Sequence, residues 1–206
     1  MRIAVLGGTG SFGTALARRL VAAGADVLIG SREVERARAT AEPLGAEGGT
    51  NDDVARRAEL VVLAVKAEAA VDTARKHARA VGRTPLLCVA SELRFGRDGV
   101  RPSEEARSVA ERVAGVVEAP VVAGLHSLAA SNLAGDEPPD EDTLVCGDDA
   151  EAKELVLGVA EKLVAGRAID AGPLAVARAL EGLTAVIVNV NKRYRAHAGV
   201  RVTGLP

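Results

Sequence analysis

The chain has 206 residues, 48% of them hydrophobic and 26% charged, with a formal net charge of −2. This composition is ordinary for a packed globular protein, and the absence of a basic excess argues against nucleic acid or a membrane surface as a partner. The two cysteines, Cys88 and Cys146, stand in apolar runs, which favours buried reduced thiols over a disulfide or a metal site. We see no signal-peptide pattern and no apolar stretch of about 20 residues, so we expect a cytoplasmic protein.

Short apolar runs alternate along the chain with longer amphipathic segments. The runs predict strands at residues 2–6, 26–29, 60–65, 85–90, 120–125, 143–146 and 167–171. The amphipathic segments predict helices at residues 11–23, 33–44, 51–58, 68–80, 102–118, 150–164 and 174–194. Strands that alternate with helices and are apolar throughout predict an α/β fold of the Rossmann type, with a doubly wound, mostly parallel sheet.

Three features refine this outline. Asn51 is a candidate cap for the helix at 51–58, and Pro102 or Ser103 is expected near the start of the helix at 102–118, after a loop over 91–101. Residues 134–142 are rich in Gly, Pro and acidic residues and predict a surface loop. With no internal repeat and no clear boundary, we expect a single domain over residues 1–206, in which 172–206 form a small C-terminal helical extension.

The segment RIAVLGGTGSFGTALARRL carries the motif G-x-G-x-x-G at Gly8, Gly10 and Gly13. The motif closes a predicted strand and opens a predicted helix, which is the context that makes it a dinucleotide-binding motif. Gly8 is expected to permit the tight turn, Gly10 to let a pyrophosphate approach the backbone, and Gly13 to let the helix pack close to the strand. The free N–H groups at the start of the helix would then face the phosphates.

The end of the second predicted strand indicates which dinucleotide is bound. A protein that binds NAD usually carries an acidic residue there, which holds the ribose 2′-hydroxyl. This chain carries Ser31 and Arg32, with Arg36 one helical turn further on. A hydroxyl and two guanidinium groups suit a 2′-phosphate, and Thr9 of the glycine loop could reach the same group. Glu33 is expected to point to solvent, so the sequence predicts NADP(H) as the cofactor.

Beyond these motifs, the chain resembles the NADPH-dependent reductases of coenzyme F420, a 5-deazaflavin. The resemblance begins in MRIAVLGGTGSFG and IGSRE. It continues in VDTAR (71–75), GLHSLAA (124–130), LVCGDD (144–149) and IDAGPL (169–174), and so extends over almost the whole chain. It implies a reversible hydride transfer between C4 of NADPH and C5 of the deazaflavin, with both carriers in one cleft. It also implies a homodimer with the C-terminal helix in the interface.

The resemblance also implies roles for individual residues. Family contacts to the pyrophosphate fall on Thr9, Gly10, Ser11 and Phe12, and those to the 2′-phosphate fall on Ser31, Arg32 and Arg36. Residues that flank the cofactor or the nicotinamide fall on Val65, Ala69, Ser91, Leu93 and Ala130. His126 falls on the histidine of the deazaflavin-side segment, where it is either a ring contact or a satisfied structural histidine. His77 and His197 are expected at the surface, and no metal site is expected.

The chain departs from the family where the second substrate would bind. Lys66 and Ala67 replace a frequent proline and tryptophan, and Ser91 and Glu92 stand in a segment that is often proline-rich. After His126, Leu128 and Ala129 stand in place of an isoleucine–proline pair. All these positions follow strands, where ligands bind in doubly wound sheets. Lys66 and Arg94 could attract an anionic part of a substrate.

These departures keep two alternatives open. One is an NADP-dependent reductase of another small acceptor, such as a ketone or an imine, which would need a proton donor in the cleft. The other is a non-catalytic NADP(H) sensor. Direct hydride transfer between two carriers needs little from side chains beyond distance, orientation and exclusion of water, so a missing acid–base pair does not argue against catalysis.

Overall fold

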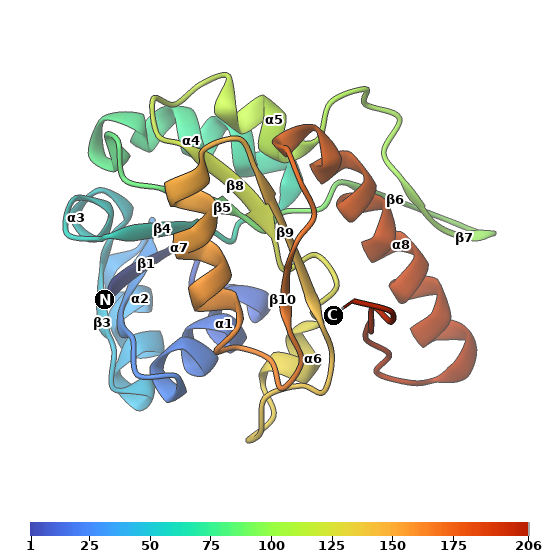
Figure 1. The fold of residues 1–206 in the computed structure, drawn as a ribbon. Coiled ribbons are helices and arrows are strands. Elements are labelled where there is room, and N and C mark those ends of the chain that lie inside the picture. Colours follow the sequence, from blue (N-terminus) through green and yellow to red (C-terminus); the bar gives the residue numbers. More distant parts are fainter. Residues whose placement is uncertain (206) are drawn as a thin grey trace.

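The computed structural model describes residues 1–205. The strands of its main sheet are β1 (Arg2–Leu6), β2 (Asp26–Ser31), β3 (Glu47–Thr50), β4 (Leu60–Leu63), β5 (Leu86–Cys88), β8 (Val121–Gly124), β9 (Thr143–Gly147) and β10 (Ala168–Asp170). Within the described residues they form one sheet in the order β10-β9-β8-β5-β4-β1-β2-β3 (Figure 1). Each neighbouring pair is parallel except β8 and β9. The predicted Rossmann-type, mostly parallel sheet is therefore confirmed.

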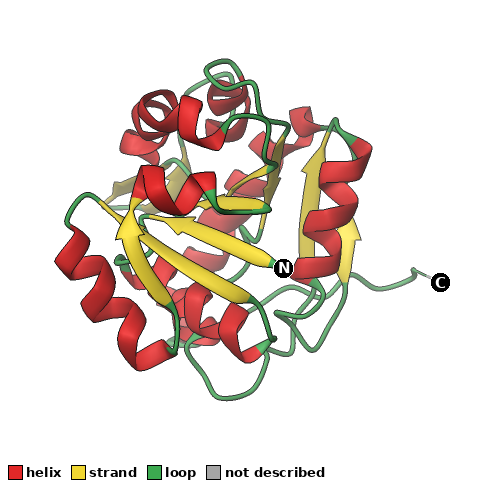
Figure 2. Ribbon diagram, turned by 90° about the vertical axis from the view of Figure 1, so that its left-hand side faces the viewer, coloured by secondary structure: helices red, strands yellow, loops and turns green. Residues whose placement is uncertain are grey.

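Helices cover both faces of this sheet, as Figures 1 and 2 show. They are α1 (Ser11–Ala22), α2 (Val34–Ala41), α3 (Asn51–Arg56), α4 (Ala67–Val81), α5 (Val109–Ala114), α6 (Ala130–Leu133), α7 (Ala150–Ala160) and α8 (Ala177–Tyr194). One buried cluster joins the sheet to α1, α2 and α7, and the other joins it to α3, α4, α5 and the start of α8. Successive residues of one strand enter different clusters, such as Val5 and Leu6 of β1. Burial on both faces explains the continuous apolar runs.

The segment after β5 differs from the prediction. In place of a loop over 91–101 and a helix from Pro102, the chain forms an antiparallel hairpin of β6 (Leu93–Gly96) and β7 (Gly99–Pro102). Pro102 ends a strand and pairs with Leu93, which an edge strand tolerates because no ladder N–H is needed there. Helix α5 begins only after Ser108, whose side chain forms a capping box with Glu111.

The side chain of Asn189 attaches the hairpin to α8. Asn189 of α8 donates to the carbonyl of Val100 at 2.7 Å and accepts from the Val100 N–H at 2.8 Å. The amide thus pairs with the backbone of β7 as a neighbouring strand would. In Figure 1 the hairpin runs beside α8, away from the main sheet.

Other short elements were also missed. Strand β3 and helix α6 were not predicted, and the cap of α3 is Thr50, whose hydroxyl accepts from the Asp53 N–H, while Asn51 is the first helical residue. Residues 134–140 form the expected surface loop, whereas Glu141 and Asp142, also expected there, are buried. Helix α1 holds the loop. Arg19, which is 4% exposed, donates to the carbonyls of Gly135, Asp136 and Glu137.

Helix α8 corrects another expectation. Among the described residues, Leu174–Tyr194 is the one helical stretch long and apolar enough to cross a membrane by length and composition. In this fold its inner face packs on the second cluster through Ala177 and Leu180 and carries a buried carboxylate, Glu181. Only 33% of its most apolar window is buried, so α8 also presents an apolar outer face, with Val186 57% exposed.

Candidate functional site

The glycine loop lies between the carboxyl end of β1 and the start of α1. Gly7, and not the predicted Gly8, adopts the left-handed conformation of the turn, with φ of 79°. Gly8 is needed for a different reason, since a Cβ there would lie 2.9 Å from the Ile29 side chain on β2. A Cβ on Gly13 would lie 2.6 Å from the Gly7 carbonyl oxygen. The close approach of α1 to the strand that Gly13 was expected to allow is therefore present.

A cavity of about 380 Å³ opens beside this loop. We call it the β2 cavity because it lies at the carboxyl end of β2. Its lining residues are Gly7, Thr9, Gly10, Ser31, Arg32, Glu33, Arg36, Asn51, Ala64, Val65, Lys66, Ala69, Thr73, Lys76 and His77. This set contains four lysine or arginine side chains and only one carboxylate, so the cavity is suited to an anionic ligand.

The wall formed by the end of β2 carries the phosphate-binding candidates. Ser31 is buried, and its hydroxyl accepts from the Glu33 N–H at 3.2 Å, which leaves the hydroxyl proton free for a ligand. The Arg36 guanidinium reaches the Thr9 carbonyl at 3.4 Å and so spans the distance between α2 and the glycine loop. Arg32 and Glu33 are exposed at the rim. A hydroxyl and two guanidinium groups are thus gathered on one side of the cavity.

A second group of predicted residues lies at the carboxyl ends of β5 and β8. Ser91, Thr184 of α8 and the backbone of His126 form a chain of hydrogen bonds, each 2.8 Å long. The His126 side chain is 5% exposed, and neither ring nitrogen has a hydrogen-bond partner among residues 1–205. Burial lowers the pKa of His126 to about 4, and the nearby Ala90 backbone only partly offsets this effect. The imidazole is therefore neutral at physiological pH.

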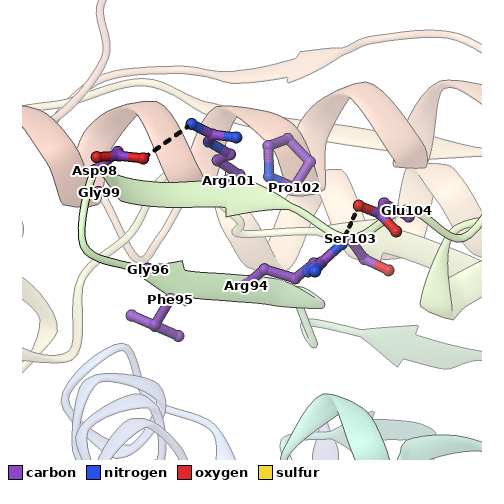
Figure 3. A pocket seen from close by; sticks show the side chains of 9 residues that line it. All are labelled: Arg94, Phe95, Gly96, Asp98, Gly99, Arg101, Pro102, Ser103 and Glu104. Carbon is purple, nitrogen blue, oxygen red and sulfur yellow. Dashed lines mark ion pairs between the residues drawn. The ribbon is translucent and has the colours of Figure 1, made fainter.

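A further hollow of about 540 Å³ runs along the β6–β7 hairpin (Figure 3). Its charged groups are already paired, Arg94 with Glu104 and Arg101 with Asp98. All four side chains are more than half exposed, so water screens them. This hollow is a surface groove, and Arg94 lies in it rather than in the β2 cavity.

Comparison with known proteins gives the family. The model of a family described as "NADP oxidoreductase coenzyme F420-dependent" matches residues 2–87. An F420-dependent NADP reductase of Methanothermobacter thermautotrophicus is 37% identical, and the alignment covers 100% of this chain and 96% of that protein. The chain belongs to the F420-dependent NADP reductase family.

Two other members support the full-length match. The F420-dependent NADP reductase of Methanocaldococcus jannaschii is 33% identical, with 100% of this chain and 99% of that protein covered. A crystal structure of a presumed F420-dependent NADP reductase of Arthrobacter sp. FB24 superposes with a TM-score of 0.83 at 28% identity, and covers 99% of this chain and 100% of that one. The family resemblance stated from the sequence is therefore confirmed.

In this family member the predicted cofactor residues separate into groups. Those that line the β2 cavity are Thr9, Gly10, Ser31, Arg32, Arg36, Val65 and Ala69, together with Lys66, which was expected on the substrate side. Gly8, Ser11, Phe12 and Gly13 belong to the glycine loop and the first turn of α1. Ser91, Leu93, His126 and Ala130 lie after β5 and β8. Leu128 is 5% exposed and packs in the first buried cluster.

One part of the cavity wall, on α4, was not predicted from the sequence. Thr73 and Lys76 were not considered, and His77 was wrongly expected at the surface, since it is 7% exposed. His197 is exposed, as predicted. The signal was available, because Ala69, Thr73 and His77 follow at intervals of four residues and so lie on one face of α4.

Two observations test whether the residues of this chain fit NADP(H) and the deazaflavin. For NADP(H), Gly7 and Gly10 of the glycine loop line the cationic cavity, and an added Cβ on Gly10 would meet nothing closer than the Gly7 carbonyl at 3.5 Å, so the backbone there is open to a ligand. For the deazaflavin, the buried His126 offers one donor and one acceptor with no protein partner among residues 1–205. The donor sets thus fit both groups. The described residues contain no group of three or more His, Cys, Asp or Glu placed to hold a metal ion.

Proposed function

We propose that this chain transfers a hydride between NADP(H) and coenzyme F420. The observation that carries this proposal is the set of Ser31, Arg32 and Arg36 on one wall of the β2 cavity, in a chain whose full length matches F420-dependent NADP reductases. The 2′-phosphate of NADP(H) would occupy this wall. The pyrophosphate would lie at the first turn of α1, near Thr9, Gly10, Ser11 and Phe12.

The residues after β5 and β8 would hold the reacting ends of the two carriers. Bound together, NADP(H) and F420 supply the carbon atoms that donate and accept the hydride. Ser91, Leu93 and Ala130 would flank the nicotinamide. His126 would hydrogen-bond the deazaflavin side, with Leu128 as packing behind it. A neutral His126 suits this role, since it can donate from one ring nitrogen and accept at the other without adding charge.

A labelled-hydride experiment tests the proposal. NADPH carrying deuterium at C4 is mixed with oxidised F420 and the protein, and the loss of the deazaflavin's visible absorbance is followed. We expect deuterium at C5 of the reduced deazaflavin, because the hydride passes directly and not through solvent. Tight NADP(H) binding with no transfer of label to F420 would contradict the proposal and would fit either alternative, the reductase of another acceptor or the sensor.

We further propose that the chain acts as a homodimer through the outer face of α8. Val186 and Tyr194 of α8 are 57% and 70% exposed, and only 33% of the most apolar window of the helix is buried. Large apolar side chains left exposed on a helix indicate a protein–protein contact. Light scattering on the wild type and on Val186→Asp tests the proposal: we expect a dimer and a monomer, respectively, and a monomeric wild type would contradict it.

Two broader expectations remain proposals. We propose that residues 1–206 act as one domain, with 172–206 as the extension that carries the dimer contact. We also propose a cytoplasmic location. Fractionation of the native host with an antibody against the protein tests the location, and recovery with the membrane fraction would contradict it.

A further inference from the structure

His77 lines the β2 cavity and is held in one orientation by two neighbours. Its Nδ1 lies 2.6 Å from the Asp52 carboxylate, and its Nε2 lies 3.3 Å from the Asn51 amide nitrogen. An amide nitrogen can only donate, so Nε2 accepts and the ring proton is on Nδ1, where it donates to Asp52. Both ring nitrogens are thus engaged within the protein. His77 also lines the cavity, and with both nitrogens engaged it offers a ligand only ring carbon atoms.

The position of this ring follows from the fold. Asn51 and Asp52 are the first two residues of α3, and His77 lies near the end of α4, which packs against α3. The Asn51 oxygen lies against Gly30 of β2, where a Cβ would come within 2.6 Å of it. Gly30 immediately precedes Ser31 of the phosphate wall. The cluster is therefore built onto the end of β2, beside the residues proposed to bind the 2′-phosphate.

The chemistry of NADP(H) indicates what lies there. The 2′-phosphate is attached to the adenosine ribose, so a phosphate held by Ser31, Arg32 and Arg36 places the adenine at the same end of the cavity. On that side the cavity wall is the face of α4 that carries Ala69, Thr73 and His77. A planar base needs a flat surface to pack on, and among residues 1–205 His77 is the one ring side chain that lines the cavity.

We infer that the adenine of NADP(H) packs on the His77 ring, and that Asn51 and Asp52 are positioning residues that keep this ring in place. The inference rests on the NADP(H) binding proposed above and adds a subsite to it. A ring fixed before the ligand arrives loses no rotamer freedom on binding, which favours affinity. Because no imidazole nitrogen is free, the contact recognises the shape of the base and not its hydrogen-bonding groups.

Calorimetry with two fragments of the cofactor tests this inference in the full chain. The fragments are 2′,5′-ADP, which contains the adenine, and nicotinamide mononucleotide, which does not. We expect His77→Ala to weaken 2′,5′-ADP binding about tenfold, in the range of base–ring contacts, and to leave the mononucleotide unchanged. His77→Phe, which keeps a flat ring, should stay within about twofold of the wild type. Val81→Ala, a buried change on α4 outside the cavity, controls for general loosening of the helix.

The positioning role has its own readout. Asp52→Asn should weaken 2′,5′-ADP binding in the wild type but not in the His77→Phe background, where no imidazole remains to be held. The loss of one negative charge near an anionic ligand acts equally in both backgrounds, so the difference between them isolates the positioning effect.

The outcomes separate the two proposals. If 2′,5′-ADP binds the wild type and His77→Ala leaves its affinity within twofold, the adenine subsite is wrong while NADP(H) binding stands. Equal losses in His77→Ala and His77→Phe would also overturn the inference. If 2′,5′-ADP does not bind the wild type at all, NADP(H) binding itself is wrong.

Discussion

The carboxylate of Asp142 accepts a hydrogen bond from the backbone N–H of Val202 at 2.8 Å, and this bond ties the C-terminal segment to the start of β9. Asp142 is completely buried and also accepts from the backbone and guanidinium of Arg167 and from Arg201. These donors hold the pKa of Asp142 well below its usual range, the Arg167 side chain most of all. One carboxylate thus joins three segments that are distant in the sequence.

We predict that Asp142→Asn destabilises the fold by about 2 to 4 kcal/mol, because an amide nitrogen would face donors inside the protein. Denaturant unfolding measures the loss, and hydrogen exchange should show the Val202 amide opening first. Asp140→Asn is the matched control, since Asp140 is exposed and pairs only with Arg201 among the described residues. Equal stability of both variants would contradict the prediction. The wild-type contribution of Asp142 persists above the ordinary carboxyl pKa and is lost only in strong acid.

The effect of Glu181 on stability changes with pH in the direction opposite to that of Asp142. It is 1% exposed and accepts from the Val109 N–H at 2.6 Å, and burial raises its pKa from 4.5 to about 7. A carboxyl with a raised folded pKa binds protons more tightly in the folded state, so stability falls as pH rises from about 4.5 to 7. We predict that Glu181→Gln removes this fall, on the order of 2 kcal/mol. Unfolding at pH 5 and pH 7.5 measures it, with the exposed Glu105→Gln as control.

His126 also changes the stability of the fold in this pH range, with a sign opposite to that of Glu181. Its pKa falls from 6.5 to about 4 on burial, so the unfolded state binds more protons between these values and stability rises with pH. We predict that the two slopes partly cancel in the wild type. His126→Leu should therefore leave a stability that decreases from pH 5 to 7, while Glu181→Gln leaves one that increases. Parallel pH profiles of the two variants would show that these groups do not control the dependence.

The glycine loop permits a direct steric test. A Cβ at position 13 would lie 2.6 Å from the Gly7 carbonyl and 2.8 Å from the Gly8 Cα. We predict that Gly13→Ala pushes α1 away from the loop, costs about 1 to 3 kcal/mol of stability and weakens NADP(H) binding. Gly158→Ala is the control, because this glycine of α7 has nothing within 4 Å of the added methyl. That variant should be neutral or slightly stabilised.

Much of this architecture was predictable because both faces of the sheet are buried. The strands then read as apolar runs, and helix periodicity located α1, α4 and α7. The hairpin was not predictable from local pattern, because Pro102 is a good helix-start residue whose preference is overridden by its pairing with Leu93 and by the Asn189 contact from α8. These contacts join residues far apart in the sequence.

The candidate site likewise has residues that the local sequence pattern predicts and residues that only contacts between distant segments bring into place. Ser31, Arg32 and Arg36 were found because the end of β2 has a fixed role in this fold. His77 was misplaced because its helix surface looks charged, and only the packing of α3 brings Asp52 and Asn51 onto it. Gly7 was passed over in favour of Gly8, since a motif gives the spacing of glycines but not which of them adopts a positive φ.

The most direct test of the account is the ratio of dissociation constants for NAD⁺ and NADP⁺, measured by calorimetry at one ionic strength. Charge-assisted contacts to the 2′-phosphate are worth about 1.5 to 3 kcal/mol each, so two or more should favour NADP⁺ by roughly 100-fold or more. In Arg32→Ala combined with Arg36→Ala the ratio should fall close to one, mainly through loss of NADP⁺ affinity. A wild-type protein that binds the two dinucleotides equally, or prefers NAD⁺, would contradict the account.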